Sequence, residues 1–476
     1  MALNWAGAAA PGCAVACSAH ETRWAPSGLT LRREILTIAA LAAASVFGAA
    51  GLARAPAAAA AARLSPRALS AELSRDMAHA GRGSGALVYD ASARRTLFAS
   101  RATRARPPAS VQKLYTSTTA LLLMGGGAQL STSVLAVGSQ GPDGAWNGDL
   151  YLRGGGDPTF GSTDFIRSFY GAGQGSSVSD LALMLSQRGI TAVHGRVLGD
   201  ESLFDGLRGG PRTGGRADRD VEGTLSALAF NRGQVGRQRG PHAPAAYAAE
   251  MLSAALRGVG IPVDGSPGSA PTPAPASATP LAAVASPPLQ TLLRLQNRPS
   301  DNYLAETLIK GLGARFGGAG TTAAGAGVVR RTLGRLGLPV RVVDGSGLSR
   351  ADRTSPRAVV TLLAELSGDA RGQVLRSSLA VAGRAGTLKT RMRGTAAAGR
   401  CQAKTGTLDL VSNLAGWCSA AGGHTIVFAL EMDGISLYSA HVLQDRMAVA
   451  LARYDDASGP AQPPPRALPG GFGSGR

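Results

Sequence analysis

The chain has 476 residues, 44% of them hydrophobic and 17% charged, with a formal net charge of +19. This length allows two or three domains with a large core, and the composition excludes a disordered chain. The charge indicates either a polyanionic partner, such as an anionic cell-wall polymer, or an arginine-rich codon bias spread over a solvated surface. Aromatic residues make up only 5% of the chain and are not interleaved with basic runs, so no nucleic-acid partner is expected.

Residues 1–62 have the pattern of an export leader. Arg32 and Arg33 precede the apolar stretch Ile35–Leu52, which is followed by small residues and an alanine run that ends at Ala62. We expect this segment either to be removed during export or to remain as a membrane anchor. Its many alanines make it weakly hydrophobic, which favours removal. In both cases the protein is expected to be exported and to act outside the cytoplasm.

Two short strands and a helix are the first elements predicted after the leader. Gly85–Asp90 and Thr96–Ala99 have the composition of strands and are separated by a polar turn. A pair of prolines then interrupts the chain just before Ser110. From this serine we predict a helix that ends at Gly125–Gly127.

The rest of the chain is assigned from the same signals. Helices are predicted at 245–257, 289–296, 301–312, 323–336 and 440–454, and strands at 149–152, 402–407, 412–419 and 425–433. Residues 264–288 are rich in Pro, Ala and Ser and are expected to form a flexible loop. The tail at 457–476 is expected to be disordered.

This order of elements predicts an α/β (α+β) fold with one insertion. The two early strands and the three late strands are expected to form one antiparallel sheet, flanked by helices on both faces. That domain would comprise residues 66–138 and 289–456. Residues 139–288 would form one inserted smaller domain.

Two of the few lysines in the chain lie in short sequence motifs. Only four of the 49 Lys+Arg residues are lysines: Lys113, Lys310, Lys389 and Lys404. Lys113 follows Ser110 by three positions, which places both side chains on one face of a helix. A desolvated lysine can lose its proton and accept one from a serine hydroxyl, whereas arginine stays protonated. Alone, this spacing is weak evidence, because surface Ser and Lys residues often match it by chance.

Two further motifs follow in the chain. Ser300–Asn302 reads S-D-N, which is either a helix N-cap provided by the serine or a source of a hydroxyl and an amide for catalysis. Lys404–Thr407 reads K-T-G-T, which is either an edge strand with a solvated lysine or a cationic strand that binds an anionic substrate. In this order, S-x-x-K, S-D-N and K-T-G form the signature of penicillin-binding proteins and class A β-lactamases.

The chain resembles the D-alanyl-D-alanine carboxypeptidase/endopeptidase family, the class C low-molecular-mass penicillin-binding proteins. Besides the three motifs, the segments typical of this family are Gly154–Thr159, Asp344–Arg350, Ala382–Leu388 and Ala403–Leu408. The resemblance extends over about residues 66–456. It implies a transpeptidase-like penicillin-binding domain that hydrolyses D-alanyl-D-alanine bonds in peptidoglycan stem peptides, needs no cofactor or metal, and is inhibited covalently by β-lactams.

The resemblance implies a catalytic role for four residues. Ser110 would be the acylated nucleophile and Lys113 its general base. Ser300 would relay a proton. The backbone N–H groups of Ser110 and Thr407 would form the oxyanion hole.

The resemblance also implies how substrate is bound. Asn302 would orient the substrate amide. Lys404 and Thr405 would bind the terminal carboxylate of D-Ala-D-Ala. Arg350 would line the pocket for the stem-peptide side chain.

Two alternative functions keep the same fold. One is a β-lactamase or esterase, and class A β-lactamases deacylate with a glutamate-held water. Between the second and third motifs the glutamates are Glu306 and Glu365, and neither lies in a recognisable deacylation loop. The other alternative is a catalytically silent wall-binding homologue, against which the intact motifs argue.

Four cysteines are present, and two of them, Cys13 and Cys17, lie within the leader. Cys401 and Cys418 flank the K-T-G-T motif and would face each other across a hairpin. In an exported protein such a pair either forms a cross-strand disulfide or consists of two small buried residues.

Overall fold

The computed structural model describes residues 62–234 and 243–456. The predicted tail and nearly all of the predicted leader, including its apolar stretch, lie outside these residues. Within the described ranges, no helix is both long enough and apolar enough to cross a membrane.

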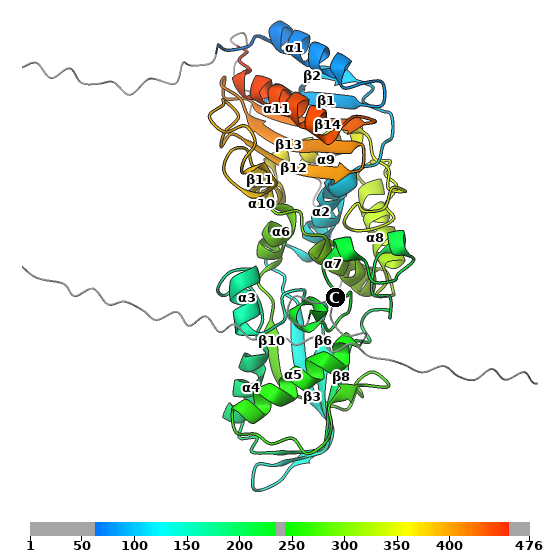
Figure 1. Ribbon diagram of the computed structural model, residues 1–476, viewed down its shortest axis with the longest axis vertical. Helices are drawn as coiled ribbons and strands as arrows, with labels where there is room; N and C mark the ends of the chain where they lie inside the picture. The colour runs from blue at the N-terminus through cyan, green and yellow to red at the C-terminus, as the bar shows by residue number, and fades with distance from the viewer. Residues whose placement is uncertain (1–61, 235–242, 457–476) are drawn as a thin grey trace, which may run out of the picture. The chain divides into compact units, whose positions relative to one another are not determined.

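A six-stranded antiparallel sheet is built from both ends of the described chain (Figure 1). Its order is β11-β12-β13-β14-β1-β2. The strands are β1 (Gly85–Asp90), β2 (Arg95–Ser100), β11 (Ala380–Val381), β12 (Cys401–Leu408), β13 (Val411–Ser419) and β14 (Thr425–Asp433). The predicted pairing of two early with three late strands is confirmed, and β11 adds a short edge strand that was not predicted.

Helices cover both faces of this sheet. The described helices are α1 (Pro66–His79), α2 (Gln112–Met124), α3 (Thr163–Phe169), α4 (Val178–Gln187), α5 (Pro244–Gly258), α6 (Leu289–Asn297), α7 (Asn302–Phe316), α8 (Thr322–Gly334), α9 (Pro356–Glu365), α10 (Ala370–Ser378) and α11 (Leu437–Arg453). Along β14, Phe428 and Leu430 pack in one cluster with α1 and α11, whereas Val427 and Ala429 pack in another with α2 and α9. Because side chains alternate along a strand, both faces of the sheet are buried.

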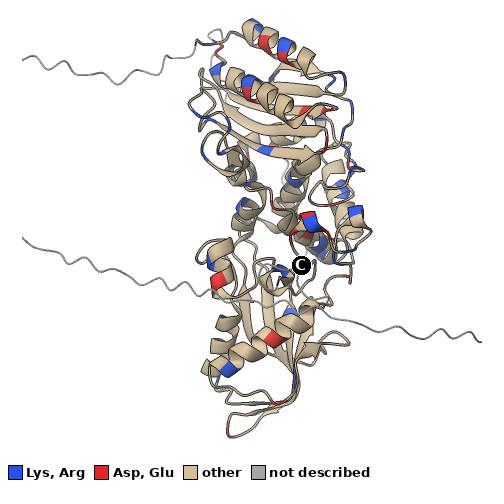
Figure 2. Ribbon diagram, in the orientation of Figure 1, with Lys and Arg blue, Asp and Glu red and all other residues tan. Residues whose placement is uncertain are grey.

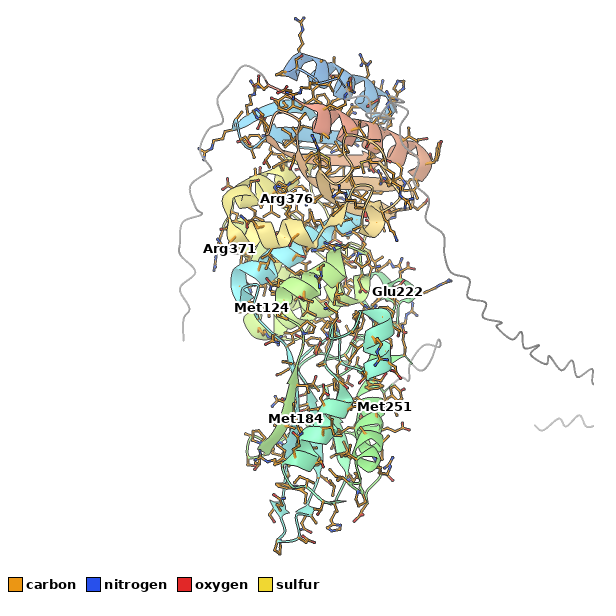
Figure 3. The ribbon with its side chains drawn as sticks, turned by 90° about the vertical axis from the view of Figure 1, so that its left-hand side faces the viewer. Met124, Met184, Glu222, Met251, Arg371 and Arg376 are labelled. Carbon is orange, nitrogen blue, oxygen red and sulfur yellow. A yellow bond between two sulfur atoms is a disulfide. The ribbon has the colours of Figure 1, made fainter. Side chains whose placement is uncertain are left out.

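The middle of the chain forms two further sheets. One has the order β10-β3-β6-β8-β9 and the other β4-β5-β7. Their strands are β3 (Ser131–Ala136), β4 (Ser139–Gln140), β5 (Trp146–Asn147), β6 (Leu150–Gly154), β7 (Val193–His194), β8 (Val197–Asp200), β9 (Gly268–Ser269) and β10 (Thr279–Ala285). Figure 3 shows the side chains of Met184 on α4 and Met251 on α5 in this part of the molecule. The core there includes Leu181, Leu185 and Leu252.

The predicted start of the insertion at residue 139 is too late. Strand β3 pairs with β10 on one side and with β6 on the other, so it belongs to the inserted sheet. The inserted region therefore begins no later than Ser131.

The predicted flexible loop at 264–288 is also wrong, because it contains β9 and β10. Leu281 and Val284 of β10 are buried, and the strand pairs with β3 over its length. The ladder shifts register between Pro280 and Ala282, and such irregularities are where a strand tolerates proline. The Pro- and Ala-rich composition therefore concealed a paired strand.

Candidate active site

Ser110 lies in a tight turn immediately before α2. The turn is a short 3₁₀ helix, Ala109–Val111, and the α-helix itself begins at Gln112. The Asn413 side chain on β13 donates to the carbonyls of Pro107 and Pro108, at 3.0 and 2.9 Å. The serine turn is thereby attached to the central sheet.

The glycine of the K-T-G-T motif allows β12 to approach this turn. A Cβ atom on Gly406 would lie 2.7 Å from the Pro108 carbonyl oxygen and 3.1 Å from the Ser110 nitrogen. The first contact is shorter than a carbon atom tolerates and the second is tight, so a larger residue would push strand and turn apart. A glycine within a strand commonly marks such a close approach of another part of the backbone.

Lys113 contacts the Ser110 hydroxyl. Its Nζ lies 2.8 Å from Ser110 Oγ, 2.6 Å from Asn302 Oδ1 and 2.9 Å from the Ser346 carbonyl oxygen. The lysine is fully buried, and this burial lowers its pKa to about 8, although the negative charges of Asp344, Glu306 and Asp301 act in the opposite direction. A substantial fraction of Lys113 is therefore neutral near physiological pH.

The S-D-N motif contacts both motif lysines. Ser300 Oγ lies 2.8 Å from Lys404 Nζ, while Asn302 contacts Lys113. Ser300 has a left-handed backbone conformation, with φ of 73°, which is uncommon for a residue other than glycine. The reading of Ser300 as the helix cap is wrong: Asp301 is the N-cap of α7, because its carboxylate accepts the backbone N–H of Leu304 at 2.9 Å.

Lys404 is buried on β12. It donates to Ser300 Oγ and to the Thr405 carbonyl oxygen, both at 2.8 Å. Burial lowers the pKa of Lys404 well below its usual value, and the positive charge of Lys113 lowers it further. An incoming carboxylate would reverse this effect, because an adjacent negative charge stabilises the ammonium form.

The other two polar members of the K-T-G-T motif lie farther out. The hydroxyls of Thr405 and Thr387 are 2.8 Å apart, and Thr387 belongs to the Ala382–Leu388 segment. Thr407 is exposed near the end of β12. Arg350 is also exposed, and its guanidinium donates to the carbonyl of Asp409 in the turn after β12.

The loop Asp344–Arg350 packs directly behind the nucleophile. A Cβ on Gly347, which has φ of 85°, would lie 1.8 Å from the Ala109 carbonyl oxygen, so only glycine fits. Asp344 accepts the N–H groups of Gly347 and Ser349, both at 2.7 Å. The loop therefore presents its Ser346 carbonyl to Lys113 in a fixed direction.

Glu306 is a residue whose role the sequence reasoning missed. Its Oε1 accepts the backbone N–H groups of Gly345 at 3.0 Å and Ser346 at 2.8 Å. The side chain is fully buried, which raises the pKa of Glu306 to about 8. Its position four residues after Asn302 on α7 was a usable signal, since that spacing places both on one helix face.

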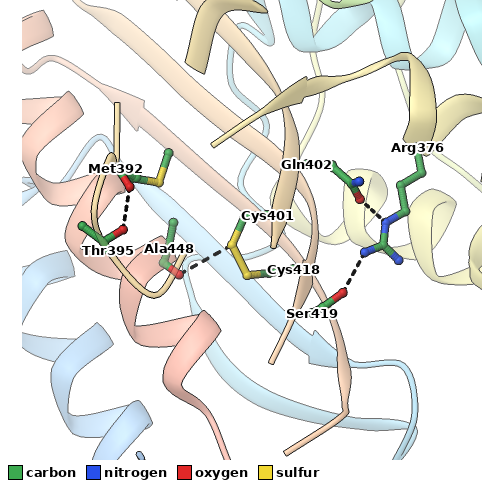
Figure 4. Close-up of a disulfide and its surroundings, with 8 residues drawn as sticks. All are labelled: Arg376, Met392, Thr395, Cys401, Gln402, Cys418, Ser419 and Ala448. Carbon is green, nitrogen blue, oxygen red and sulfur yellow. Dashed lines mark hydrogen bonds between the residues drawn. A yellow bond between two sulfur atoms is a disulfide. The ribbon is translucent and has the colours of Figure 1, made fainter. Parts of the chain in front are cut away.

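Cys401 and Cys418 are directly opposite each other on β12 and β13 and are joined by a disulfide (Figure 4). Their Cα atoms are 4.0 Å apart. Next to them, Arg376 of α10 bridges the two strands by donating to Gln402 and, at 3.0 Å, to Ser419 Oγ. The base of the hairpin that carries Lys404 is thus linked covalently and by hydrogen bonds.

A serine in contact with a partly neutral lysine can be acylated, so this site defines a serine acyl-transfer enzyme. The comparisons identify its family. The chain belongs to the D-Ala-D-Ala carboxypeptidase 3 (S13) family, whose model matches residues 67–213 and 212–454. It is therefore a serine-type carboxypeptidase, and the resemblance seen in the sequence is confirmed.

Several relatives and solved structures are similar over most of their length. A D-alanyl-D-alanine carboxypeptidase of Actinomadura sp. is 28% identical over 80% of this chain and 83% of its own. Carboxypeptidase DacB of Mycolicibacterium smegmatis is 30% identical over 68% of this chain and 70% of its own. The structure of penicillin binding protein 4 from Haemophilus influenzae has a TM-score of 0.66 and 21% identity, covering 79% of this chain and 97% of that one. This last similarity confirms the predicted penicillin-binding fold.

Proposed function

We propose that the chain hydrolyses D-alanyl-D-alanine bonds of peptidoglycan stem peptides through an acyl-enzyme on Ser110. The observation that carries this proposal is the 2.8 Å contact between Ser110 Oγ and the buried Lys113 Nζ, together with the depressed pKa of this lysine. A neutral amine has two hydrogens and one lone pair. It can donate to Asn302 and Ser346 and still accept the serine proton.

In the first half-reaction, Lys113 accepts the Ser110 proton as Oγ bonds to the carbonyl carbon of the penultimate D-Ala. The peptide C–N bond then breaks, and the proton returns through Lys113 and Ser300 to the leaving amine. In the second half-reaction water attacks the ester, which frees Ser110 and the shortened peptide. The N–H groups of Ser110 and Thr407 would stabilise the oxyanion in both halves, typically by about 3 kcal/mol per donor.

The residues around Ser110 and Lys113 are proposed to bind the substrate. Lys404 and Thr405 receive the terminal carboxylate, and Asn302 orients the substrate amide. The contacts of Lys404 support this assignment: its hydrogen bonds go to neutral oxygens, so a bound carboxylate would be the negative charge that stabilises its protonated form. Arg350 lies beside the outer end of β12, where the stem-peptide side chain would extend.

A β-lactam is proposed to acylate Ser110 in the same way and to inhibit the enzyme covalently. The Haemophilus penicillin binding protein 4, which shares the fold, has been solved in complex with a β-lactam. Because these substrates and inhibitors are encountered in the cell wall, we propose that the chain acts there, outside the cytoplasm.

The β-lactamase alternative is less well supported by the site. Glu306 Oε1 accepts two backbone N–H groups of the Asp344–Arg350 loop, and neither of these hydrogen bonds involves Ser110. Steady turnover of penicillin would favour the alternative, whereas a long-lived adduct would support the peptidase.

Digestion of defined muropeptides tests the proposal and separates its two activities. Loss of one D-alanine from a pentapeptide muropeptide shows carboxypeptidase activity, and conversion of a cross-linked dimer to monomers shows endopeptidase activity. We expect products from the wild type and none from Ser110→Ala. Equal product formation by both proteins would overturn the assignment of Ser110.

A further inference from the structure

The inserted region contacts the S-D-N motif at two points. Both contacts come from residues 219–234, called here the inner segment. The backbone carbonyl of Asp220 accepts the Asn302 side-chain amide at 2.7 Å. The guanidinium of Arg232 forms an ion pair with Asp301, the middle residue of the motif. The site is therefore completed by a part of the chain that carries none of its three motifs.

Arg232 is enclosed on several sides. Its side chain has no exposed surface, and its Nε donates to the Tyr170 hydroxyl at 2.7 Å. The guanidinium carbon lies 4.3 Å from the ring centre of Phe169 and 4.9 Å from that of Tyr303. Because arginine stays protonated, such a site requires a counter-charge, and Asp301 provides it.

Asp301 connects Arg232 with the two neighbouring residues of the motif, Ser300 and Asn302. One carboxylate oxygen caps α7 at Leu304, and the other accepts from Arg232. Ser300, on one side, contacts Lys404, and Asn302, on the other, contacts Lys113. A rotation of Asp301 would therefore displace two groups that the proposed reaction uses.

The backbone around Arg232 is specialised for this contact. Asn231, Arg232 and Gly233 all have left-handed conformations, with φ of 50°, 60° and 68°. Two non-glycine residues in this region persist only where surrounding contacts require them. One such contact is the 2.9 Å hydrogen bond from the backbone N–H of Thr224 to the Arg232 carbonyl.

We propose that Arg232 is a positioning residue for the S-D-N motif: through Asp301 it sets the orientation of Ser300 and Asn302. The inserted region would thus help to position the groups needed for acylation, in addition to any contact that it makes with the substrate. The inference rests on the proposed acyl-enzyme reaction.

The test compares β-lactam acylation of wild type, Arg232→Met, Arg232→Lys and Asp301→Asn, each followed by intact mass and stopped-flow kinetics. Asp301→Asn is informative because asparagine still caps a helix while it removes the counter-charge. We expect the limiting acylation rate to fall by about 10- to 100-fold in Arg232→Met and in Asp301→Asn, as for other small misplacements of catalytic groups. The dissociation constant of the initial complex should change by less than about threefold, because the hydrogen bonds of Arg232 and Asp301 do not involve Lys404 or Thr405, which are proposed to bind the carboxylate. Arg232→Lys should recover part of the rate.

Lys310→Met is the matched control. Lys310 also lies on α7 and is buried, and it contacts the inserted region through Asp205 at 2.5 Å and the Leu207 carbonyl at 2.9 Å. Its hydrogen bonds go to Asp205 and Leu207, outside the three motifs, so its loss should lower stability without lowering the acylation rate by more than about twofold.

The double variant Arg232→Met/Asp301→Asn shows whether Arg232 and Asp301 act together on the S-D-N motif or independently of each other. We expect it to acylate no more slowly than the slower single variant, within about twofold. An Arg232→Met rate equal to that of Lys310→Met overturns the inference. The inference is also overturned if the fold reduction in acylation rate of the double variant equals the product of the reductions in the two single variants.

Two further outcomes are also decisive. If Arg232→Met does not fold, Asp301→Asn and Arg232→Lys decide by the same comparison with Lys310→Met. If the wild type forms no adduct, the proposed function itself fails. If the wild type reacts and the Arg232 variants react equally fast, only the role of Arg232 is overturned.

Discussion

At Lys113, three oxygen atoms surround a nitrogen that has only two hydrogens when it is neutral. The Asn302 and Ser346 oxygens can accept those hydrogens, which leaves the lone pair directed at Ser110. Burial supplies the neutral form by lowering the pKa of Lys113 to about 8. The geometry and the pKa shift therefore favour the same role.

Replacing Lys113 by arginine should abolish acylation while the protein remains folded. Arginine retains the positive charge, but its pKa is too high for it to accept the serine proton. We expect the β-lactam acylation rate to fall by at least about 1000-fold, in the range typical of lost general-base catalysis. Thermal unfolding measured in parallel serves as the control for folding. A variant that acylates at the wild-type rate would exclude the general-base role.

Acylation should also depend on pH in a defined direction. Because the neutral amine is the reactive form, the rate should be low at pH 6, rise through a midpoint near pH 8 and level off above it. The measurement is the second-order rate constant of β-lactam acylation between pH 6 and 10, with melting temperatures recorded at each pH. A flat profile for a protein that stays folded would show that Lys113 does not titrate in this range.

At the scale of elements, the site depends on how closely β12 approaches the serine turn. Gly406→Ala introduces a methyl group 2.7 Å from the Pro108 carbonyl oxygen. The strand and the turn must separate, and we expect acylation to slow by about 100-fold, as for a displacement of about 1 Å. Gly334→Ala at the end of α8 is the control, since a Cβ there meets nothing within 4 Å. Equal rates in the two variants would contradict the close-approach argument.

The elements also show what the sequence could and could not predict. The hydrophobic strands β1, β12, β13 and β14 and the three motifs were visible, because local composition and spacing define them. Strand β10 was not, since its Ala and Pro residues read as a loop until β3 supplies a partner. Helices α1, α3, α4, α9 and α10 were missed, although local caps mark most of them, such as Ser355 for α9.

Some residues of the site could be predicted from the sequence and others could not. Ser110, Lys113, Ser300, Asn302 and Lys404 stand in short motifs, so a linear reading finds them, and the structure brings them together. The contacts of Glu306 and Arg232 depend on segments far away in the chain, the Asp344–Arg350 loop and Asp301 respectively. The spacing of Glu306 from Asn302 places both on one face of α7, but no local pattern identifies the distant partners of Glu306 or Arg232.

At the scale of the whole molecule, part of the positive charge serves the fold. Arg106 is buried and donates to the backbone carbonyls of Gly83, Ser84 and Arg104. Arg391 pairs with Asp445 of α11 at 2.6 Å. Figure 2 shows Lys and Arg on many of the helices and loops of the described chain. Binding to anionic cell-wall polymers remains a prediction from net charge.

The disulfide between Cys401 and Cys418 should stabilise the whole molecule. A cross-link that closes a loop of 17 residues is worth about 3 kcal/mol in the chain-entropy account. Reduction should therefore lower the melting temperature by several degrees, roughly 5–10 °C for a domain of this size. Peptide mapping after alkylation without reductant should show the two cysteines joined. Free thiols at both positions in the native protein would contradict this prediction.

The central claim, that Ser110 is a nucleophile activated by Lys113, is tested most directly by the intact mass of the protein after exposure to penicillin. The account predicts a gain of one penicillin on the wild type, located on Ser110 by peptide mapping, and no gain on Ser110→Ala. A wild type that takes up no penicillin, or a Ser110→Ala variant that takes up as much, would contradict it.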